Sequence, residues 1–175
     1  LKPETKWSLY LHTPEIYFRI LKSNKMVPLK EIAEVKYGLK PGAVEFFILP
    51  AERAQKEGVE EEFLRPVIYE PSQITGPVVE KKEVKDYILV VNKPKSHLLG
   101  TAVLNYIERG EHAEIEIKKG SRKGHLIRGY HRIESLRSRN QWYSLGEVKP
   151  APIISCVFVR DRYINAWNKA EAIAT

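Results

Sequence analysis

Hydrophobic residues recur with helical spacing in two segments of the chain, residues 16–21 and 103–107. Between residues 16 and 21 they follow Thr13-Pro14-Glu15, a sequence typical of a helix start. We therefore expect an amphipathic helix that is capped by Thr13 and ends near Ser23-Asn24. Two further helices are expected over residues 50–58 and 101–111, the second with Thr101 as its cap and Gly110 as its stop.

Runs of β-branched and aromatic residues predict the strands. Residues 85–92 form the strongest run and are apolar enough to be buried on both faces. Shorter strands are expected at residues 32–37, 44–49 and 113–118. A β-hairpin is expected where residues 151–159 and 162–167 flank Arg160-Asp161-Arg162. Because strands and helices are mixed without regular alternation, we expect an α+β fold with a mixed, largely antiparallel sheet and short helices.

Length and composition are those of a soluble globular protein. The chain has 175 residues, of which 43% are hydrophobic and 29% are charged, so one domain over residues 1–175 is expected. No apolar run approaches the roughly 20 residues that a membrane-spanning helix needs. Cys156 is the single cysteine, which excludes an internal disulfide and fits a reducing cytoplasm. The twenty Glu and two Asp favour a thermophilic source. Because the sequence starts at Leu1, we interpret it as a piece of a larger polypeptide.

The positive charge of the chain is concentrated in one window, residues 118–139. The window contains eight basic residues and one acid, Glu134, a balance of +7, which equals the net charge of the whole chain. The remainder of the chain is therefore neutral. A solvated loop is the simplest interpretation of such a run.

Three features of this window favour a polyanionic partner instead. Its arginines outnumber its lysines five to three, and the guanidinium fork suits phosphates and guanine edges. Gly120, Gly124 and Gly129 allow the backbone to approach a partner closely. The aromatic residues Tyr130 and Trp142-Tyr143 could stack on bases. Nucleic acid is the expected partner, and a membrane is disfavoured because the apolar stripe of the window is thin.

The sequence contains no convincing catalytic motif. Glu-x-Lys tripeptides, among them those at residues 34–36, 83–85, 116–118 and 147–149, could each close a magnesium-dependent nuclease site if an upstream carboxylate helped to hold the metal. Asp86 is the only aspartate upstream of two of them. The histidines show no metal-ligand spacing, and nucleotide-binding loops and nucleophile motifs are absent. We therefore expect no catalytic residue and no metal site, while an RNA-binding module and a magnesium-dependent nuclease remain as alternatives.

Several segments together resemble a known family. They are "WSLYLHTPEIYFRIL", "LKEIAEVKYGLKPGAVEFFIL", "EEFLRPVI", "DYILVVNKPKSHLLGTAVLNYIERGE" and "RNQWYSLGEVKPAPII", between residues 7 and about 164. Segments like these occur in the same order in the C-terminal target-recognition domain of TaqI-like N6-adenine DNA methyltransferases and of combined restriction-modification enzymes. The resemblance implies a reader of double-stranded DNA. It leaves open whether the parent also cleaves DNA.

The resemblance also implies a division of labour. In such enzymes a separate N-terminal methyltransferase domain of the same polypeptide binds S-adenosylmethionine and carries an Asn/Asp-Pro-Pro-aromatic motif. This chain has no Pro-Pro pair, so no cofactor is expected in this domain. The loops at residues 36–43 and 122–142 are expected to face DNA. The resemblance supports contacts from Lys36, Gly38, Lys40, Gly42, Lys93, Trp142 and Tyr143, and the basic window adds Arg122, Lys123, Arg128, Arg132, Arg137 and Arg139.

Overall fold

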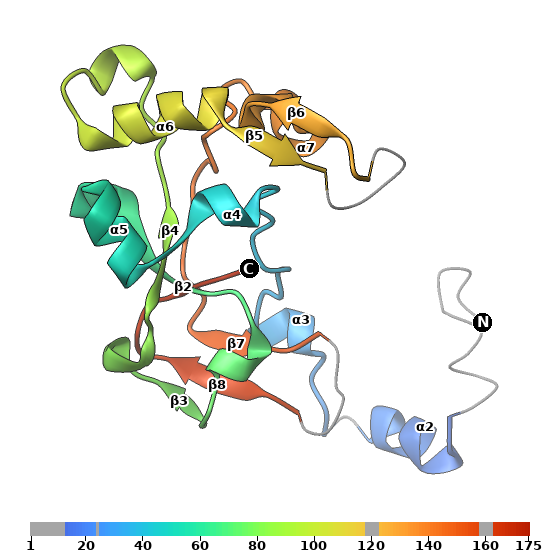
Figure 1. Cartoon of the computed structure of the whole chain (residues 1–175). Coiled ribbons are helices and arrows are strands. Elements are labelled where there is room, and N and C mark those ends of the chain that lie inside the picture. Colours follow the sequence, from blue (N-terminus) through green and yellow to red (C-terminus); the bar gives the residue numbers. More distant parts are fainter. Residues whose placement is uncertain (1–12, 24, 118–122, 158–162) are drawn as a thin grey trace. The chain divides into compact units, whose positions relative to one another are not determined.

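The chain divides into an N-terminal unit, residues 1–37, and a second unit, residues 38–175. The computed structural model in Figure 1 describes residues 13–23, 25–117, 123–157 and 163–175. Arg122 and the expected turn at Arg160-Asp161-Arg162 lie outside the described residues. None of the helices within these ranges combines the length and the apolar character needed to cross a lipid bilayer.

Within its described residues, 13–23 and 25–37, the N-terminal unit contains two short helices. The expected amphipathic helix is confirmed as α2 (Glu15–Lys22), but the predicted cap is wrong, because Pro14 holds the N-cap position and no side chain caps this end. The strand expected at residues 32–37 is also wrong. One helical turn, α3 (Leu29–Ile32), follows Pro28, and no described strand pairs with the exposed residues after it. An isolated extended segment gains no ladder hydrogen bonds, so it does not form a strand.

In the part of the second unit that the structure describes, short helices combine with three small sheets. Its helices are α4 (Val44–Phe47), α5 (Ala51–Glu57), α6 (Ala102–His112) and α7 (Glu134–Arg137). Its 3₁₀ turns are η1 (Glu61–Phe63), η2 (Pro71–Gln73), η3 (Lys81–Glu83), η4 (Lys95–His97) and η5 (Tyr130–Arg132). Its strands are β1 (Ile48–Pro50), β2 (Leu64–Ile68), β3 (Val78–Val79), β4 (Asp86–Leu89), β5 (Glu114–Glu116), β6 (Leu126–Arg128), β7 (Ile153–Ser155), β8 (Asn165–Asn168) and β9 (Ile173–Ala174).

The sheets confirm the expected α+β fold. The largest has the strand order β1-β4-β2-β9, with β4 antiparallel to both of its neighbours and β9 parallel to β2. A second sheet has the order β3-β8-β7, in which the antiparallel pair β7 and β8 confirms the expected hairpin strands. The third is the antiparallel pair of β5, expected at residues 113–118, and β6. The strongest predicted strand is confirmed as β4, where Ile88 and Leu89 are fully buried.

The segment predicted as a strand at residues 44–49 is strand only in its second half. Residues 44–47 form the helical turn α4, and β1 begins at Ile48. The consecutive side chains Phe46 and Phe47 are 1% and 0% exposed. Successive residues of a strand point to opposite faces, whereas this turn places both rings in the core. Burial of two adjacent aromatic side chains therefore outweighs the strand preference of the sequence.

Helix α6 carries the elements of the candidate site. The Thr101 hydroxyl accepts a hydrogen bond from the Leu104 amide, which confirms the predicted cap, and the Glu60 carboxylate accepts from the amides of Ala102 and Val103. Gly110, expected as the stop, lies inside the helix instead. A Cβ atom there would lie 2.6 Å from Phe46 Cε2, so glycine lets the helix approach the aromatic core.

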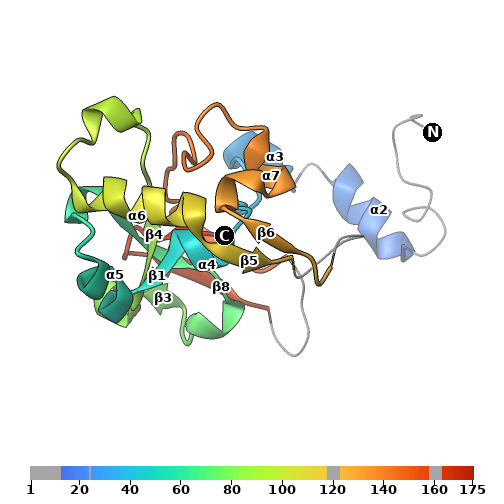
Figure 2. The same ribbon diagram turned by 45° about the horizontal axis from the view of Figure 1, so that its top comes forward.

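The main core lies between the largest sheet and α6 and extends under α7. It includes Phe46, Ile88, Ile107 and Leu136. The hydroxyl of Tyr106 donates to the Phe46 carbonyl at 2.8 Å, and burial raises the pKa of Tyr106 to about 12. Figures 1 and 2 both show β5, β6 and α7 grouped beyond one end of α6. The core therefore holds most of the described basic window against one end of this helix.

Candidate nucleic-acid interface

Residues 123–139 are the described part of the basic window and are termed the basic segment. They form an ordered structure. Strand β6 pairs with β5 in the register Glu114 to Arg128 and Ile115 to Ile127, and the Gly124 amide donates to the Ile117 carbonyl at 2.8 Å. The 3₁₀ turn η5 and the helix α7 follow. Leu136 of α7 is fully buried and fixes this segment to the core. The chain alternates here between side chains that enter the core and basic side chains that do not.

Four basic side chains of this segment are exposed. They are Lys123, Arg128, Arg132 and Arg137. Within the described ranges, none of the four forms an ion pair with a carboxylate, although Arg128 lies opposite Glu114 in the hairpin. Their charges are therefore available to an external anion.

Arg139 has a different environment from these four. Its guanidinium donates to the carbonyl oxygens of Pro41 at 2.9 Å, Lys40 at 3.3 Å and Ser144 at 3.3 Å. It also lies over the ring of Phe47, 5.6 Å from the ring centroid. Partial burial lowers the pKa of Arg139, but a guanidinium stays protonated in proteins. Arg139 therefore joins two loops that are about a hundred residues apart in sequence.

The first of these loops carries Lys40, whose side chain is exposed. Gly42 has φ +85°, and a Cβ atom there would lie 2.8 Å from Ser135 Oγ and 2.9 Å from Leu136 Cδ2. Only glycine allows this loop to lie so close to α7. A Cβ atom at Gly38 would instead meet the backbone of Thr175 at 2.9 Å. Of the residues expected in this loop, Lys40 and Gly42 thus lie beside the basic segment, and Gly38 lies against the last residue of the chain.

Two other expected contact residues have acidic partners. Lys36 belongs to the N-terminal unit, where its ammonium lies 3.0 Å from a carboxylate oxygen of Glu34. Lys93 lies 3.1 Å from Glu62 and over the Phe63 ring. Both ion pairs are largely solvent-exposed, so each adds little stability and could exchange with another anion.

The expectation that Trp142 and Tyr143 present exposed faces is wrong. They are 9% and 3% exposed. Trp142 packs on Phe46 with ring centroids 4.7 Å apart, and its indole nitrogen donates to Glu111 at 2.8 Å. The Tyr143 hydroxyl donates to the Lys93 carbonyl at 3.2 Å. Large aromatic surfaces are stable in a core when their polar atoms find partners, and both residues meet that condition.

Glu111 connects this aromatic core to the turn after β4. Its carboxylate accepts hydrogen bonds from Trp142 Nε1 at 2.8 Å and from Lys95 Nζ at 2.7 Å. Burial alone would raise the pKa of Glu111, but the hydrogen bonds from Lys95 and Trp142 outweigh it, so the pKa is lowered. The charged form of Glu111 is therefore the one that the fold stabilises.

The lowered pKa of Glu111 predicts a pH-dependent stability. A carboxyl group with a depressed pKa stabilises the fold above the ordinary glutamate range and loses this contribution as the pH falls through its folded-state pKa. We expect the Glu111→Gln variant to be less stable than the unaltered chain by roughly 1 to 2 kcal/mol at neutral pH. Urea unfolding between pH 7 and pH 3 should show this difference shrinking as the pH falls. A difference that does not change with pH would contradict the assignment.

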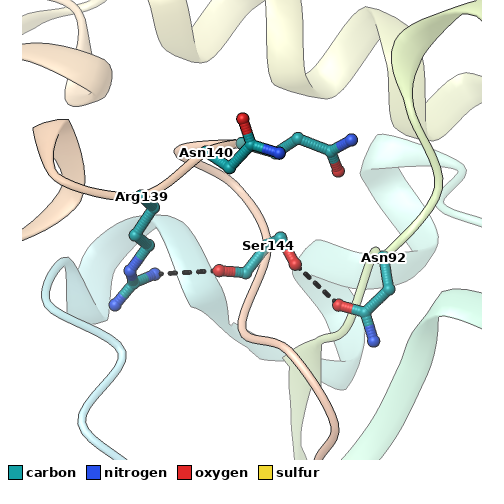
Figure 3. A pocket seen from close by; sticks show the side chains of 5 residues that line it. Asn92, Arg139, Asn140 and Ser144 are labelled. Carbon is teal, nitrogen blue, oxygen red and sulfur yellow. Dashed lines mark hydrogen bonds between the residues drawn. The ribbon is translucent and has the colours of Figure 1, made fainter.

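A polar cleft of about 290 Å³ lies between the segment after α7 and the turn after β4. It is lined by Asn92, Arg139, Asn140, Gln141 and Ser144. Figure 3 shows the dashed hydrogen bonds that connect Arg139 to Ser144 and Ser144 to Asn92, with Asn140 beside them. The Asn92 amide also donates to the Gly146 carbonyl at 2.8 Å. These bonds bring the turn carrying Lys93 next to the loop at residues 139–146.

The contact residues expected from the sequence do not include Asn140, Gln141 or Ser144. A signal was present, because two consecutive carboxamides stand between an arginine and Trp142 in "RNQWYS".

The residues considered for a nuclease site have other partners. Glu147 and Lys149 of one Glu-x-Lys tripeptide pair with each other at 2.7 Å, and the Asp86 carboxylate accepts a hydrogen bond from the Gln73 amide at 2.7 Å. Within the described ranges, no three His, Cys, Asp or Glu side chains gather as a metal site requires.

The comparison with known families decides what this domain is. The model of the C-terminal domain of the type II methyltransferase M.Eco57I matches residues 3–175. The chain belongs to this family of methyltransferase C-terminal domains. The match confirms the resemblance to specificity domains of DNA methyltransferases noted in the sequence.

A curated relative agrees with this family. The type II methyltransferase M.AccI of Acinetobacter calcoaceticus is 28% identical to the chain over 167 residues. The match covers 91% of the chain and 27% of M.AccI, so the chain spans about a quarter of the length of that methyltransferase. No solved structure matches the chain significantly.

Proposed function

We propose that the chain is the double-stranded DNA recognition domain of a site-specific adenine-N6 methyltransferase of a restriction-modification system. One observation carries the proposal. Arg139 joins the loop of Lys40 to the basic segment through the carbonyls of Lys40 and Pro41. Two loops expected to contact DNA are thereby held together. The exposed cations Lys40, Lys123, Arg128, Arg132 and Arg137 would then lie on duplex phosphates and release counterions.

Methyl transfer belongs, in this proposal, to a separate N-terminal domain of the same polypeptide, which binds S-adenosylmethionine. The recognition domain, which is the present chain, grips the base pairs and phosphates around the target. The separate catalytic domain receives the flipped adenine. Support comes from the family match and from the small share of M.AccI that the chain covers. The absence of a Pro-Pro pair from the sequence fits the same division.

The positions of Tyr130, Trp142 and Tyr143 support a duplex as the ligand in preference to single-stranded RNA. Proteins that read single strands stack unpaired bases on exposed aromatic side chains. Here Trp142 and Tyr143 are in the core, and Tyr130 lies half-buried with its ring 5.1 Å from that of Phe46. The groups that remain accessible near the cleft are the cationic side chains of Lys40 and Arg137 and the carboxamides of Asn140 and Gln141. These groups suit phosphates and the edges of paired bases.

A competition experiment tests this proposal. The labelled probe is a 30-base-pair duplex with a randomised centre, and the competitors are the unlabelled duplex pool and a single-stranded RNA pool of equal length. We expect the duplex to displace the probe at a concentration at least tenfold lower than the RNA. Stronger competition by the RNA, or no binding of the probe at all, would overturn the proposal. A magnesium-containing incubation with plasmid, in which we expect no cleavage, tests the nuclease alternative.

A further inference from the structure

The polar cleft contains two carboxamides that the fold does not use. Arg139, Ser144 and Asn92, which also line it, are joined by hydrogen bonds to one another or to backbone carbonyls. Within the described part of the chain, the side chains of Asn140 and Gln141 make no hydrogen bond. Each therefore presents an unused donor and an unused acceptor to the solvent.

The loop that carries these carboxamides is fixed on both sides. On one side, Arg139 is bonded to the carbonyls of Lys40 and Pro41. On the other, Trp142 is bonded to Glu111 and Tyr143 to the Lys93 carbonyl. A loop held by its own flanking residues loses little conformational entropy when it binds a ligand. This is the support that a recognition element needs.

The composition of the cleft indicates its ligand. Small-molecule sites are lined mainly by apolar side chains, whereas this cleft is lined by amides, a guanidinium and a hydroxyl. The carboxamide of Asn or Gln is complementary to the N6 and N7 atoms of adenine, which a duplex exposes in its major groove. The exposed cations Lys40 and Arg137 belong to the segments on either side of the bonds made by Arg139, where they can contact phosphates.

We propose that Asn140 and Gln141 are specificity-determining residues that read adenine edges in the major groove of the recognised DNA sequence. The inference rests on the proposed function, because it assumes that the domain binds duplex DNA. It assigns the reading of bases to these carboxamides and leaves the arginines and lysines to the phosphate backbone. The two tasks are then separable by mutation.

The experiment selects duplexes from a randomised pool with three forms of the 175-residue chain. These are the unaltered chain, the Asn140→Ala/Gln141→Ala variant, and a control in which an exposed Asn and an exposed Gln elsewhere are changed, Asn105→Ala/Gln55→Ala. For each form, affinity is measured for the selected sequence and for the unselected pool. Thermal unfolding checks that all three forms are equally folded.

We expect the unaltered chain and the control to enrich one sequence that contains adenine. The Asn140→Ala/Gln141→Ala variant should bind the pool within about twofold of the unaltered chain but lose the preference for that sequence by about 10- to 100-fold. Enrichment of the same sequence by that variant with undiminished preference would overturn the inference, as would enrichment of nothing by the unaltered chain. Failure of the unaltered chain to bind the pool would instead remove the proposed function itself.

Discussion

Replacing Trp142 with alanine is expected to lower the free energy of unfolding by about 3 to 5 kcal/mol. The side chain is 9% exposed, and its ring contacts Phe46 at a centroid distance of 4.7 Å. Its truncation would leave a cavity next to Gly110, where Trp142 Cη2 lies 3.2 Å from the position a Cβ atom would take. It would also remove the donor that the Glu111 carboxylate accepts from. Urea unfolding followed by circular dichroism gives the value.

Two further variants make this result specific. Trp167→Ala is the matched control, because Trp167 is 55% exposed on β8, and its loss should cost under about 1 kcal/mol. Trp142→Phe keeps an aromatic ring and removes the indole N–H, so an intermediate loss of about 1 to 2 kcal/mol is expected. If Trp142→Ala were no less stable than Trp167→Ala and yet bound DNA poorly, Trp142 would be a contact residue and its burial would be contradicted.

Replacing Arg128, Arg132 and Arg137 together with alanine is expected to weaken duplex binding by about 100-fold at low salt. Each arginine is exposed, and none is paired with a carboxylate among the described residues. Loss of three charge-assisted phosphate contacts, at about 1 kcal/mol or more each, gives this magnitude. Arg139 is left in place, because its bonds to the Lys40 and Pro41 carbonyls make it part of the fold. Fluorescence anisotropy with the duplex pool measures the affinity.

The control for charge alone is the variant with Lys81, Lys82 and Lys85 replaced by alanine. These lysines are exposed and follow β3, which Figure 1 places far from β6 and α7 in the same unit. The net charge changes equally in both variants, so this control should keep its affinity within a few-fold. Equal losses in the two variants would mean that binding follows the net charge and not the basic segment.

The sequence predicted those elements whose stability depends on local features, such as a helix cap, apolar spacing or a run of apolar residues. Helix α6 followed from its cap and its apolar spacing, and strand β4 from a run of residues that suits burial on both faces. The predictions failed where packing over long distances decides. Residues 44–47 turn into a helix so that two phenylalanines enter the core, and Gly110 continues α6 so that it can meet Phe46.

The candidate site shows the same division. The count of charged residues along the chain was sufficient to locate the basic segment, because this count requires no knowledge of the fold. Nothing local indicated that Arg139 bonds to carbonyls 98 and 99 positions away in sequence. Trp142 was expected to offer a flat face for stacking on bases, but it packs instead against Phe46 and Glu111, which come from distant parts of the chain. The sequence does not indicate that the carboxamides of Asn140 and Gln141 are unused, because this depends on the hydrogen bonds that the other residues of the cleft make in the fold.

The salt dependence of duplex binding tests most directly whether the exposed arginines of the basic segment contact phosphates. Affinity is measured at several salt concentrations for the unaltered chain and for the variant lacking Arg128, Arg132 and Arg137. Five or so phosphate contacts predict a slope of about −4 to −5 for log K against log salt, and loss of three contacts should bring it to about −2. The same slope for both proteins would contradict the account.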